Sequence, residues 1–310
     1  MVRPGDYALL DCGDGRRLER FGPLVLDRPA PGAARPRRAP DRWAGATVYR
    51  AGAGWRGPDG GPPGDAAYAV SVAGVVMEVR PAPSGAVGLF PEHASNADWL
   101  AAATRRRVAR AARAAVEPPD VLNLFAYTGL ASLVVARAGG RVVHVDASRP
   151  SVQWARRNAE LSDLADRPIR WIVDEAMSFV LREARRGRRY AGLILDPPSY
   201  GHGARSGAGA GTDRAGRTGT TGSAVTWRFD ERIDELLDAC SGVAEPDAFW
   251  LLTAHTPNWD PARLAGTLGL AIDAPARAIE AVELRLVAES GAVLPVGSAA
   301  RFDPIPPKRR

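Results

Sequence analysis

The feature that most constrains this chain is a regular alternation of short apolar runs and helical segments. The apolar runs are VLNLFA at 121–126, RVVHVDA at 141–147, IRWIV at 169–173 and YAGLILD at 190–196. Segments with helical spacing separate them, at residues 129–138, 149–160 and 176–186. Strands that alternate with helices build parallel βαβ units, so we expect an α/β fold with helices on both faces of the sheet.

The first 88 residues have a different pattern. Their apolar stretches are short and end at Gly-Asp, Gly-Pro and Pro-rich points: YALLDCGDG, RRLERFG, PLVLDRP, ATVYRAGAGW and YAVSVAGVVMEVR. Such stretches with period-2 character predict strands joined by turns. We therefore expect a small antiparallel β-rich N-terminal module over residues 1–88, with the α/β domain over residues 89–310.

The α/β domain opens and closes with further recognisable elements. PEHASNADWLAAATRRRVARAARAAV predicts a helix that ends before Pro118 and Pro119, and WRFDERIDELLDACSGV predicts another. FWLLTAH predicts a strand, and VELRLVAE with AVLPVGSAARF predicts a closing antiparallel pair. Residues 203–224 are rich in Gly, Ser and Thr and almost free of apolar side chains, so we expect a flexible insertion that orders on substrate binding.

The net charge of +6 comes almost wholly from arginine. The clusters RRR at 105–107 and RRGRR at 185–189 fit either a nucleic-acid contact or a solvated helix face. No apolar run is long enough to span a bilayer and the N-terminus has no leader pattern, so we expect a cytoplasmic protein with no membrane partner. Cys12 and Cys240 lack metal-ligand spacing, and the sequence predicts inert thiols and no metal site.

Ligands of an open α/β sheet bind at the carboxyl ends of the strands. The first run ends in NLFAYTG, where Gly129 allows a close backbone approach to a ligand at a helix N-terminus, although no dinucleotide or P-loop pattern is present. The second run ends at Asp146, which suits the two hydroxyls of a ribose or, like Ser148, the cap of the next helix.

The third and fourth strand ends also carry acids. Asp174 or Glu175 can accept from an adenine amino group or cap the following helix. The fourth end, LDPPSYGHG, presents rigid carbonyl oxygens beside Asp196 and an aromatic face at Tyr200. This stretch is either a stiff exit from the strand or the place where a methyl acceptor is held.

Taken in order, NLFAYTG, HVDAS, the acid pair and LDPPSYG resemble the class I S-adenosylmethionine-dependent methyltransferases. The likeness is greatest to the bacterial 23S ribosomal RNA cytosine-C5 and guanine-N7 enzymes and covers roughly residues 86–260. GLFPEHASNADWL resembles their FPEQ-type segment, with His93 in place of the usual Gln. The resemblance implies a Rossmann-like domain with a mostly parallel seven-stranded sheet and S-adenosyl-L-methionine as cofactor.

The resemblance also implies roles for individual residues. The cofactor site would comprise Phe90, Phe125, Tyr127, Thr128, Gly129, Asp146, Ala147, Ser148, Asp174, Glu175 and Asp196. The catalytic residues facing the methyl group would be Asp196, Pro197, Pro198 and Tyr200. Family members commonly carry Asp where this chain has Glu175, so that contact departs from the family pattern.

Cytosine-C5 methylation requires a cysteine thiolate that adds to the ring, and the stretch that would carry it here reads LLTAHTPNW. We therefore expect methylation at a base nitrogen of RNA, ribosomal RNA in particular, with carbonyls of Asp196 and Pro197 accepting from the base amine. His255 is a candidate general base. Two alternatives remain: methylation of a small molecule, and an RNA-binding protein with a vestigial cofactor pocket.

Overall fold

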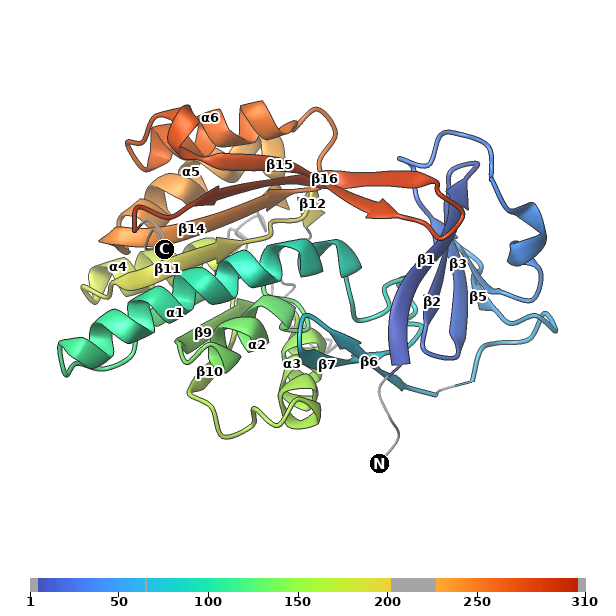
Figure 1. The fold of residues 1–310 in the computed structure, drawn as a ribbon, viewed down its shortest axis with the longest axis horizontal. Coiled ribbons are helices and arrows are strands. Elements are labelled where there is room, and N and C mark those ends of the chain that lie inside the picture. The colour runs from blue at the N-terminus through green and yellow to red at the C-terminus, as the bar shows by residue number, and fades with distance from the viewer. Residues whose placement is uncertain (1–4, 65, 202–226, 306–310) are drawn as a thin grey trace, which may run out of the picture.

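The structure, a computed structural model, describes residues 5–64, 66–201 and 227–305. Its elements form two seven-stranded sheets, one from the N-terminal third of the chain and one from the remainder (Figure 1). The insertion expected at 203–224 lies outside the described residues. Among the helices that are described, none has both the length and the apolar character needed to cross a membrane.

The first sheet has the strand order β5-β4-β3-β2-β1-β6-β7. Its strands are β1 (Gly5–Gly13), β2 (Arg16–Phe21), β3 (Leu24–Pro29), β4 (Thr47–Arg50), β5 (Gly54–Arg56), β6 (Tyr68–Val72) and β7 (Val75–Val79), with a 3-10 turn η1 (Pro40–Trp43) between β3 and β4. The strand content matches the prediction, but the sheet is mixed, because β3 pairs with β4 and β1 with β6 in parallel. Both pairs are separated by chain long enough to cross over, as parallel pairing requires.

For one stretch of the first sheet, the sequence did not separate two strands. YAVSVAGVVMEVR is two strands, β6 and β7, joined at Ala73 and Gly74, whose φ angles are 51° and 76°. Two consecutive positive φ values match the tight hairpin turn that suits the natural twist of paired strands.

The second sheet has the order β10-β9-β8-β11-β14-β16-β15. Its strands are β8 (Asp120–Leu124), β9 (Arg141–Asp146), β10 (Ile169–Val173), β11 (Tyr190–Leu195), β14 (Ala244–Ala254), β15 (Glu280–Val287) and β16 (Val293–Phe302). The first five are parallel to one another, whereas β16 is antiparallel to both of its neighbours. The mostly parallel seven-stranded sheet is thus confirmed. Its strand order reverses between β8 and β11, which is where ligands of such sheets bind.

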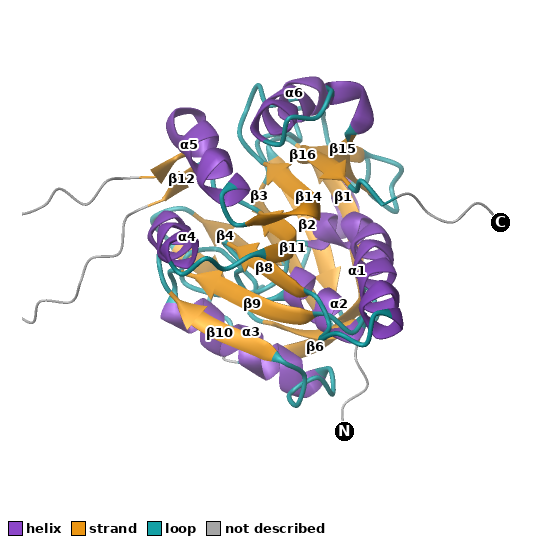
Figure 2. Ribbon diagram, turned by 90° about the vertical axis from the view of Figure 1, so that its left-hand side faces the viewer, coloured by secondary structure: helices purple, strands orange, loops and turns teal. Residues whose placement is uncertain are grey.

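Helices cover both faces of this sheet (Figure 2). They are α1 (Ala97–Arg113), preceded by η2 (Pro91–Asn96), α2 (Leu130–Arg137), α3 (Arg149–Leu161), α4 (Ala176–Arg185), α5 (Phe229–Ser241) and α6 (Pro261–Ala271), followed by η3 (Ala276–Ala278). On β11, Leu193 packs with α4, α5 and α6, while its neighbour Ile194 packs with α1 and α2. This alternation follows from the period-2 direction of strand side chains. Helix α6 was not predicted from the sequence.

The two sheets are joined through buried contacts. The tip of the β15–β16 hairpin reaches β1, where the N–H groups of Glu289 and Ser290 donate to the carbonyls of Leu9 and Leu10 at 2.9 and 3.2 Å (Figure 1). On another side, a single apolar cluster combines Met77 of β7 with Leu133 of α2. The N-terminal module therefore packs as an integral wall of the α/β unit, and a domain boundary near residue 88 remains a proposal.

Neither arginine cluster lies near the carboxyl ends of the strands. In α1, Arg106 and Arg107 pair with Asp303, and Arg110 pairs with Asp247 near the start of β14. Arg189 donates to the carbonyl of Gly242, just before β11 begins. The paired members of these clusters tie elements together at the opposite edge of the sheet, and the two alternatives left open for the clusters, a nucleic-acid contact or a solvated helix face, stay predictions.

Candidate functional site

The turn after β8 has a backbone that is unusual for its residue types. Phe125 and Tyr127 have φ angles of 54° and 48°, and Gly129 has a φ of 93°. Non-glycine residues with positive φ cost about 1–3 kcal/mol each and gather at functional sites. A Cβ on Gly129 would also meet Ala155 Cβ at 3.1 Å. The turn therefore requires glycine at 129 and has a strained shape that suits a ligand cradle.

Asp146, at the end of β9, holds this turn in place. Its Oδ2 accepts from the N–H of Tyr127 and its Oδ1 from the N–H of Ser148, both at 2.8 Å. Burial raises the pKa of Asp146, although both hydrogen bonds act in the opposite direction. Ser148 caps α3 by accepting from the N–H of Ser151. Ser148 therefore takes the capping role, whereas the contact of Asp146 with a ribose stays a prediction.

At the end of β10, Glu175 caps α4. Its two carboxylate oxygens accept from the N–H groups of Met177 and Ser178 at 3.0 and 2.8 Å. Asp174 is paired with Arg182 and accepts from the N–H of Glu175. Both acids line the cleft next to Asp146. The capping role of Glu175 is confirmed, and its contact with adenine stays a prediction.

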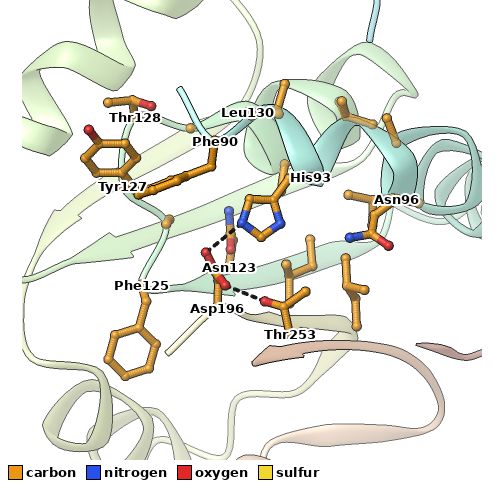
Figure 3. A pocket seen from close by; sticks show the side chains of 18 of the residues that line it. Phe90, His93, Asn96, Asn123, Phe125, Tyr127, Thr128, Leu130, Asp196 and Thr253 are labelled. Atoms are coloured by element: carbon orange, nitrogen blue, oxygen red, sulfur yellow. Dashed lines mark hydrogen bonds and ion pairs between the residues drawn. The ribbon is translucent and has the colours of Figure 1, made fainter. Parts of the chain in front are cut away.

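A cavity of about 870 Å³ runs along these strand ends. It is lined by nine of the residues predicted for the cofactor: Phe90, Phe125, Tyr127, Asp146, Ala147, Ser148, Asp174, Glu175 and Asp196. We call this cavity the cofactor cleft. Thr128 and Gly129 instead line a smaller cavity of about 60 Å³ beneath the turn, which Figure 3 shows. The Thr128 hydroxyl donates to the Gly88 carbonyl at 2.7 Å, so this side chain holds the turn against the chain before η2.

At the fourth strand end, three of the four predicted catalytic residues line the cleft and the fourth lies outside it. Asp196, Pro197 and Pro198 line the cofactor cleft. Tyr200 lies on the short strand β12 (Tyr200–Gly201), where its side chain is 73% exposed and outside the cleft lining. This placement does not support base stacking by Tyr200.

A different aromatic residue stands at this end of the cleft. Trp227, on β13 (Trp227–Arg228), is buried, lines the cleft and donates from Nε1 to the Pro198 carbonyl at 2.7 Å. Its ring lies 5.2 Å from that of Phe125. Sequence reasoning missed Trp227 because the Gly-rich segment separates it from the motif; a large aromatic residue directly after that segment was the available signal.

Two histidines and a threonine surround the Asp196 carboxylate. His93 Nε2 lies 3.0 Å from Oδ2, His255 Nε2 lies 3.3 Å from Oδ1, and the Thr253 hydroxyl donates to Oδ1. Figure 3 shows His93 and Thr253 directed at this carboxylate from η2 and from β14. Burial raises the pKa of Asp196, but His93 and then His255 outweigh it and hold the pKa well below its usual range.

His255 does not fit the expected role of general base. Burial lowers its pKa, but the hydrogen bond and attraction to Asp196 outweigh burial and raise the pKa to about 9. Its Nδ1 donates to the Val296 carbonyl at 2.7 Å. The neighbouring carboxylate therefore favours the protonated ring, and a ring that already carries its proton is a poor base.

A second cleft of about 670 Å³ adjoins the first. One wall comes from the N-terminal sheet, at Arg17 and residues 29–32, and the other from residues 256–261. Phe90 and His255 line both clefts. The second cleft therefore meets the cofactor cleft at these two residues.

Neither cysteine belongs to the site. Cys12 lies in an apolar cluster between the first sheet and the β15–β16 hairpin, and Cys240 lies on α5 in the main core. Burial raises the pKa of both thiols. Both behave as packing residues, in agreement with the sequence, and neither is placed to add to an acceptor ring.

Comparison with known proteins places this geometry in context. No protein-family model matches the chain. It is similar to the crystal structure of a SAM-dependent methyltransferase from Agrobacterium tumefaciens, with 31% identity, coverage of 97% of this chain and 91% of that chain, and a TM-score of 0.79. A candidate SAM-dependent methyltransferase from Streptococcus mutans shares the fold at 14% identity, covering 96% of this chain and 76% of that chain, with a TM-score of 0.66.

Proposed function

The chain belongs to the S-adenosylmethionine-dependent methyltransferases, and we propose that it methylates a nitrogen atom of a base in RNA, ribosomal RNA in particular. Its cofactor is S-adenosyl-L-methionine. The observation that carries the proposal is the meeting of the two clefts at Phe90 and His255, beside Asp196. A base that enters between the sheets is brought to the methyl group at that junction.

In this proposal each strand end binds a different part of the cofactor. Asp146 accepts from the ribose hydroxyls, since each of its oxygens uses one lone pair on the protein and keeps another. Asp174 lies next along the cleft and serves the adenine. The turn from Phe125 to Gly129 supports the methionine part, and Asp196 faces the sulfonium, where its negative charge is complementary.

The methyl transfer itself needs position more than acid–base chemistry. The nitrogen lone pair forms the new N–C bond in line as the C–S bond breaks, its electrons return to sulfur, and the nitrogen proton leaves to solvent. The hydrogens of the base amine are accepted by the main-chain carbonyl oxygens of Asp196 and Pro197, which no donor within the described residues bonds. The Pro198 carbonyl already accepts from Trp227. The Asp196 carboxylate is already bonded by Thr253 and stays a fixed charge.

Nitrogen is the favoured acceptor because carbon-5 chemistry lacks its nucleophile. The C5 reaction needs a thiolate that adds to C6 of the ring. Both cysteines are buried in apolar clusters away from the clefts. Nitrogen methylation needs no covalent step of this kind.

Support for RNA comes from arginines at the rim of the clefts. Arg149 follows the cleft residue Ser148, and Arg228 follows Trp227. Arg263 stacks at 4.0 Å over the ring of Trp259, which lines the second cleft. Arg228 also pairs with Glu231 and Arg263 with Asp230, both of which are exposed pairs that a phosphate can replace. Arginine forks onto phosphate oxygens, so the rim suits a polyanion that passes over the cleft.

The experiment is a salt titration of RNA binding with two charge-matched variants. Replacement of Arg149, Arg228 and Arg263 together by Ala removes three rim charges. We expect the slope of log affinity against log salt to fall by roughly three, about one per phosphate contact. Replacement of Arg105, Arg185 and Arg188 by Ala removes the same charge from the opposite edge and should leave the slope unchanged. Equal slopes in the two variants would refute RNA as the acceptor.

A second candidate is a small-molecule acceptor, which one observation favours. The second cleft is lined by Glu92, Asp260 and Glu283, while Arg17 is its one arginine among the described residues. Carboxylates repel phosphates and suit a neutral or cationic metabolite. Flat salt dependence of binding, together with methyl transfer to a metabolite extract and none to ribosomal RNA fragments, would establish this alternative.

A further inference from the structure

We infer that His93, Asp196 and His255 form a binding site for a divalent first-row transition-metal ion at the junction of the two clefts. The inference goes beyond the proposed function, which requires no metal. It also departs from the sequence prediction, because the three residues are far apart in the chain and have no recognisable ligand spacing. They come from η2, from the end of β11 and from the end of β14.

The geometry is that of a coordination site before the ion is added. One ligand atom from each residue can be chosen so that all three lie within 4.8 Å of one another. The Asp196 oxygens lie 3.0 Å from His93 Nε2 and 3.3 Å from His255 Nε2. Ligands bound at about 2.0–2.2 Å around a tetrahedral or octahedral ion lie roughly 3 to 3.5 Å apart. Only small side-chain shifts are needed to admit the ion.

The surroundings hold two of the ligands in the way that metal sites do. His255 Nδ1 donates to the Val296 carbonyl at 2.7 Å and keeps its hydrogen, while Nε2, directed at Asp196, releases its proton to solvent when an ion binds. The Thr253 hydroxyl donates to the Asp196 carboxylate. A second ring nitrogen bonded to a carbonyl and a hydrogen-bonded carboxylate are the usual outer contacts of metal ligands, because they fix tautomer and orientation.

The third ligand faces the same carboxylate. His93 Nε2 is buried and lies 3.0 Å from Asp196 Oδ2. A metal ion placed between them would be bound by the neutral ring nitrogen and by the carboxylate oxygen, both of which are common ligands of such ions. The two imidazole rings meet nearly edge to face, with centroids 5.3 Å apart, and both direct Nε2 at the Asp196 carboxylate.

The donor set indicates which ions fit. Two imidazoles and one carboxylate suit Zn²⁺, Fe²⁺, Mn²⁺ or Co²⁺ and leave coordination positions open. Asp196 and His255 line the cofactor cleft, and His255 also lines the second cleft. An oxygen or ring nitrogen of the acceptor would complete the coordination and be held beside the methyl group.

The test measures metal binding without any acceptor. Tag-free full-length chain is stripped with a chelator and titrated with Zn²⁺ by calorimetry and with Co²⁺ by visible absorption, which reports the ligand field. We expect one ion per chain. His93→Gln, which installs the residue typical of the family, and His255→Gln should each raise Kd by more than about 100-fold, since loss of an outer contact alone costs 10–100-fold. His144→Gln removes a histidine away from the cluster and should leave Kd unchanged.

A second pair of variants separates coordination from folding. Thr253→Val keeps the shape of the side chain but loses the bond to Asp196, and should raise Kd by about 10–100-fold. Thr253→Ser keeps the hydroxyl and should bind as the parent does. Absence of stoichiometric binding by the parent chain, or equal binding by the His93→Gln, His255→Gln and His144→Gln variants, overturns the site. Failure of RNA methylation with metal binding intact would instead count against the proposed function alone.

Discussion

The carboxylate of Asp146 at the end of β9 accepts a 2.8 Å hydrogen bond from the backbone N–H of Tyr127, in the turn that follows β8. This contact joins two neighbouring strand ends and fixes the backbone of a turn whose φ angles are strained. The same carboxylate faces the cofactor cleft. One side chain therefore shapes the cradle and is placed to bind its occupant.

Asp146→Ala should weaken binding of S-adenosylmethionine by about 1.5–3 kcal/mol, roughly 10 to 150-fold, because charge-assisted hydrogen bonds are lost. Asp146→Asn retains one acceptor oxygen, so its affinity for S-adenosylmethionine should lie between that of Asp146→Ala and that of the parent. Isothermal titration calorimetry with the three proteins checks this. Unchanged affinity in Asp146→Ala would exclude the ribose role, and a parent chain that does not bind the cofactor would indicate a vestigial pocket.

Gly129→Ala should impair cofactor binding more than stability. An alanine there must adopt a φ of 93° and place its Cβ 3.1 Å from that of Ala155, so the turn has to shift. Gly187→Ala is the matched control, since it has a φ of 66° but nothing within 4 Å of the new Cβ and lies away from the clefts. We expect each to lose about 1–3 kcal/mol of stability, and only Gly129→Ala to lose cofactor affinity. Urea unfolding and calorimetry measure the two effects, and equal cofactor affinity in both variants would contradict the assignment of this turn.

Replacement of both cysteines should leave methyl transfer intact. Cys12 and Cys240 are buried in separate apolar clusters, so Ala substitutions remove little more than a sulfur atom from each. Turnover of the folded Cys12→Ala, Cys240→Ala double variant, followed with labelled cofactor, should stay within about twofold of the parent if no thiolate adds to the acceptor. Loss of methyl transfer in a double variant with an unchanged circular dichroism spectrum would contradict nitrogen methylation and favour methylation at carbon.

His144 should make the protein less stable as the pH falls. It is fully buried on β9, hydrogen-bonded to Ser132, and burial lowers its pKa to about 3 from an ordinary value of 6.5. Between these two values the unfolded chain binds a proton that the folded chain does not, so acid favours unfolding. From pH 6.5 to 4.5 the contribution is about 2 kcal/mol.

The measurement is urea unfolding of the parent and of His144→Gln across this pH range. Glutamine keeps a polar group next to Ser132 but does not titrate. The free energy of unfolding of the His144→Gln variant should therefore fall less steeply than that of the parent as the pH is lowered. Parallel curves for the two proteins would show that the His144 imidazole is not held neutral by burial.

The local patterns of the sequence were sufficient for the α/β unit. Period-2 and helical spacing are set by each segment's own side chains, so the strands from Asp120 to Leu195 and the helices between them were placed to within a few residues. The positions directly after those strands follow from the same spacing, which is why Asp146, Asp174 and Asp196 were found as cleft residues. Helix α6 was missed because Pro and Gly interrupt its pattern.

The positions and contacts of side chains whose partners are distant in the sequence were predicted less well. The RRR cluster was compatible with a nucleic-acid contact or with a solvated helix face, and its spacing did not reveal that Arg106 and Arg107 pair with Asp303, almost two hundred residues later. Tyr200 was expected at the acceptor site by its place in the motif, whereas the antiparallel pairing of β12 with β13 exposes it and brings Trp227 into the cleft. Such partners cannot be read from spacing, because only the closed fold decides which segments meet.

The sequence by itself determined the order of strand ends and, through it, the family, the cofactor and the edge of the sheet where chemistry occurs. The tertiary structure decided what surrounds Asp196: His93 from η2 and His255 from beyond β14 meet at it because β11 and β14 are neighbours and η2 is held beside β15 and α1. Backbone periodicity is a local property of the chain, whereas the charge and coordination of a buried carboxylate depend on residues that only folding brings together.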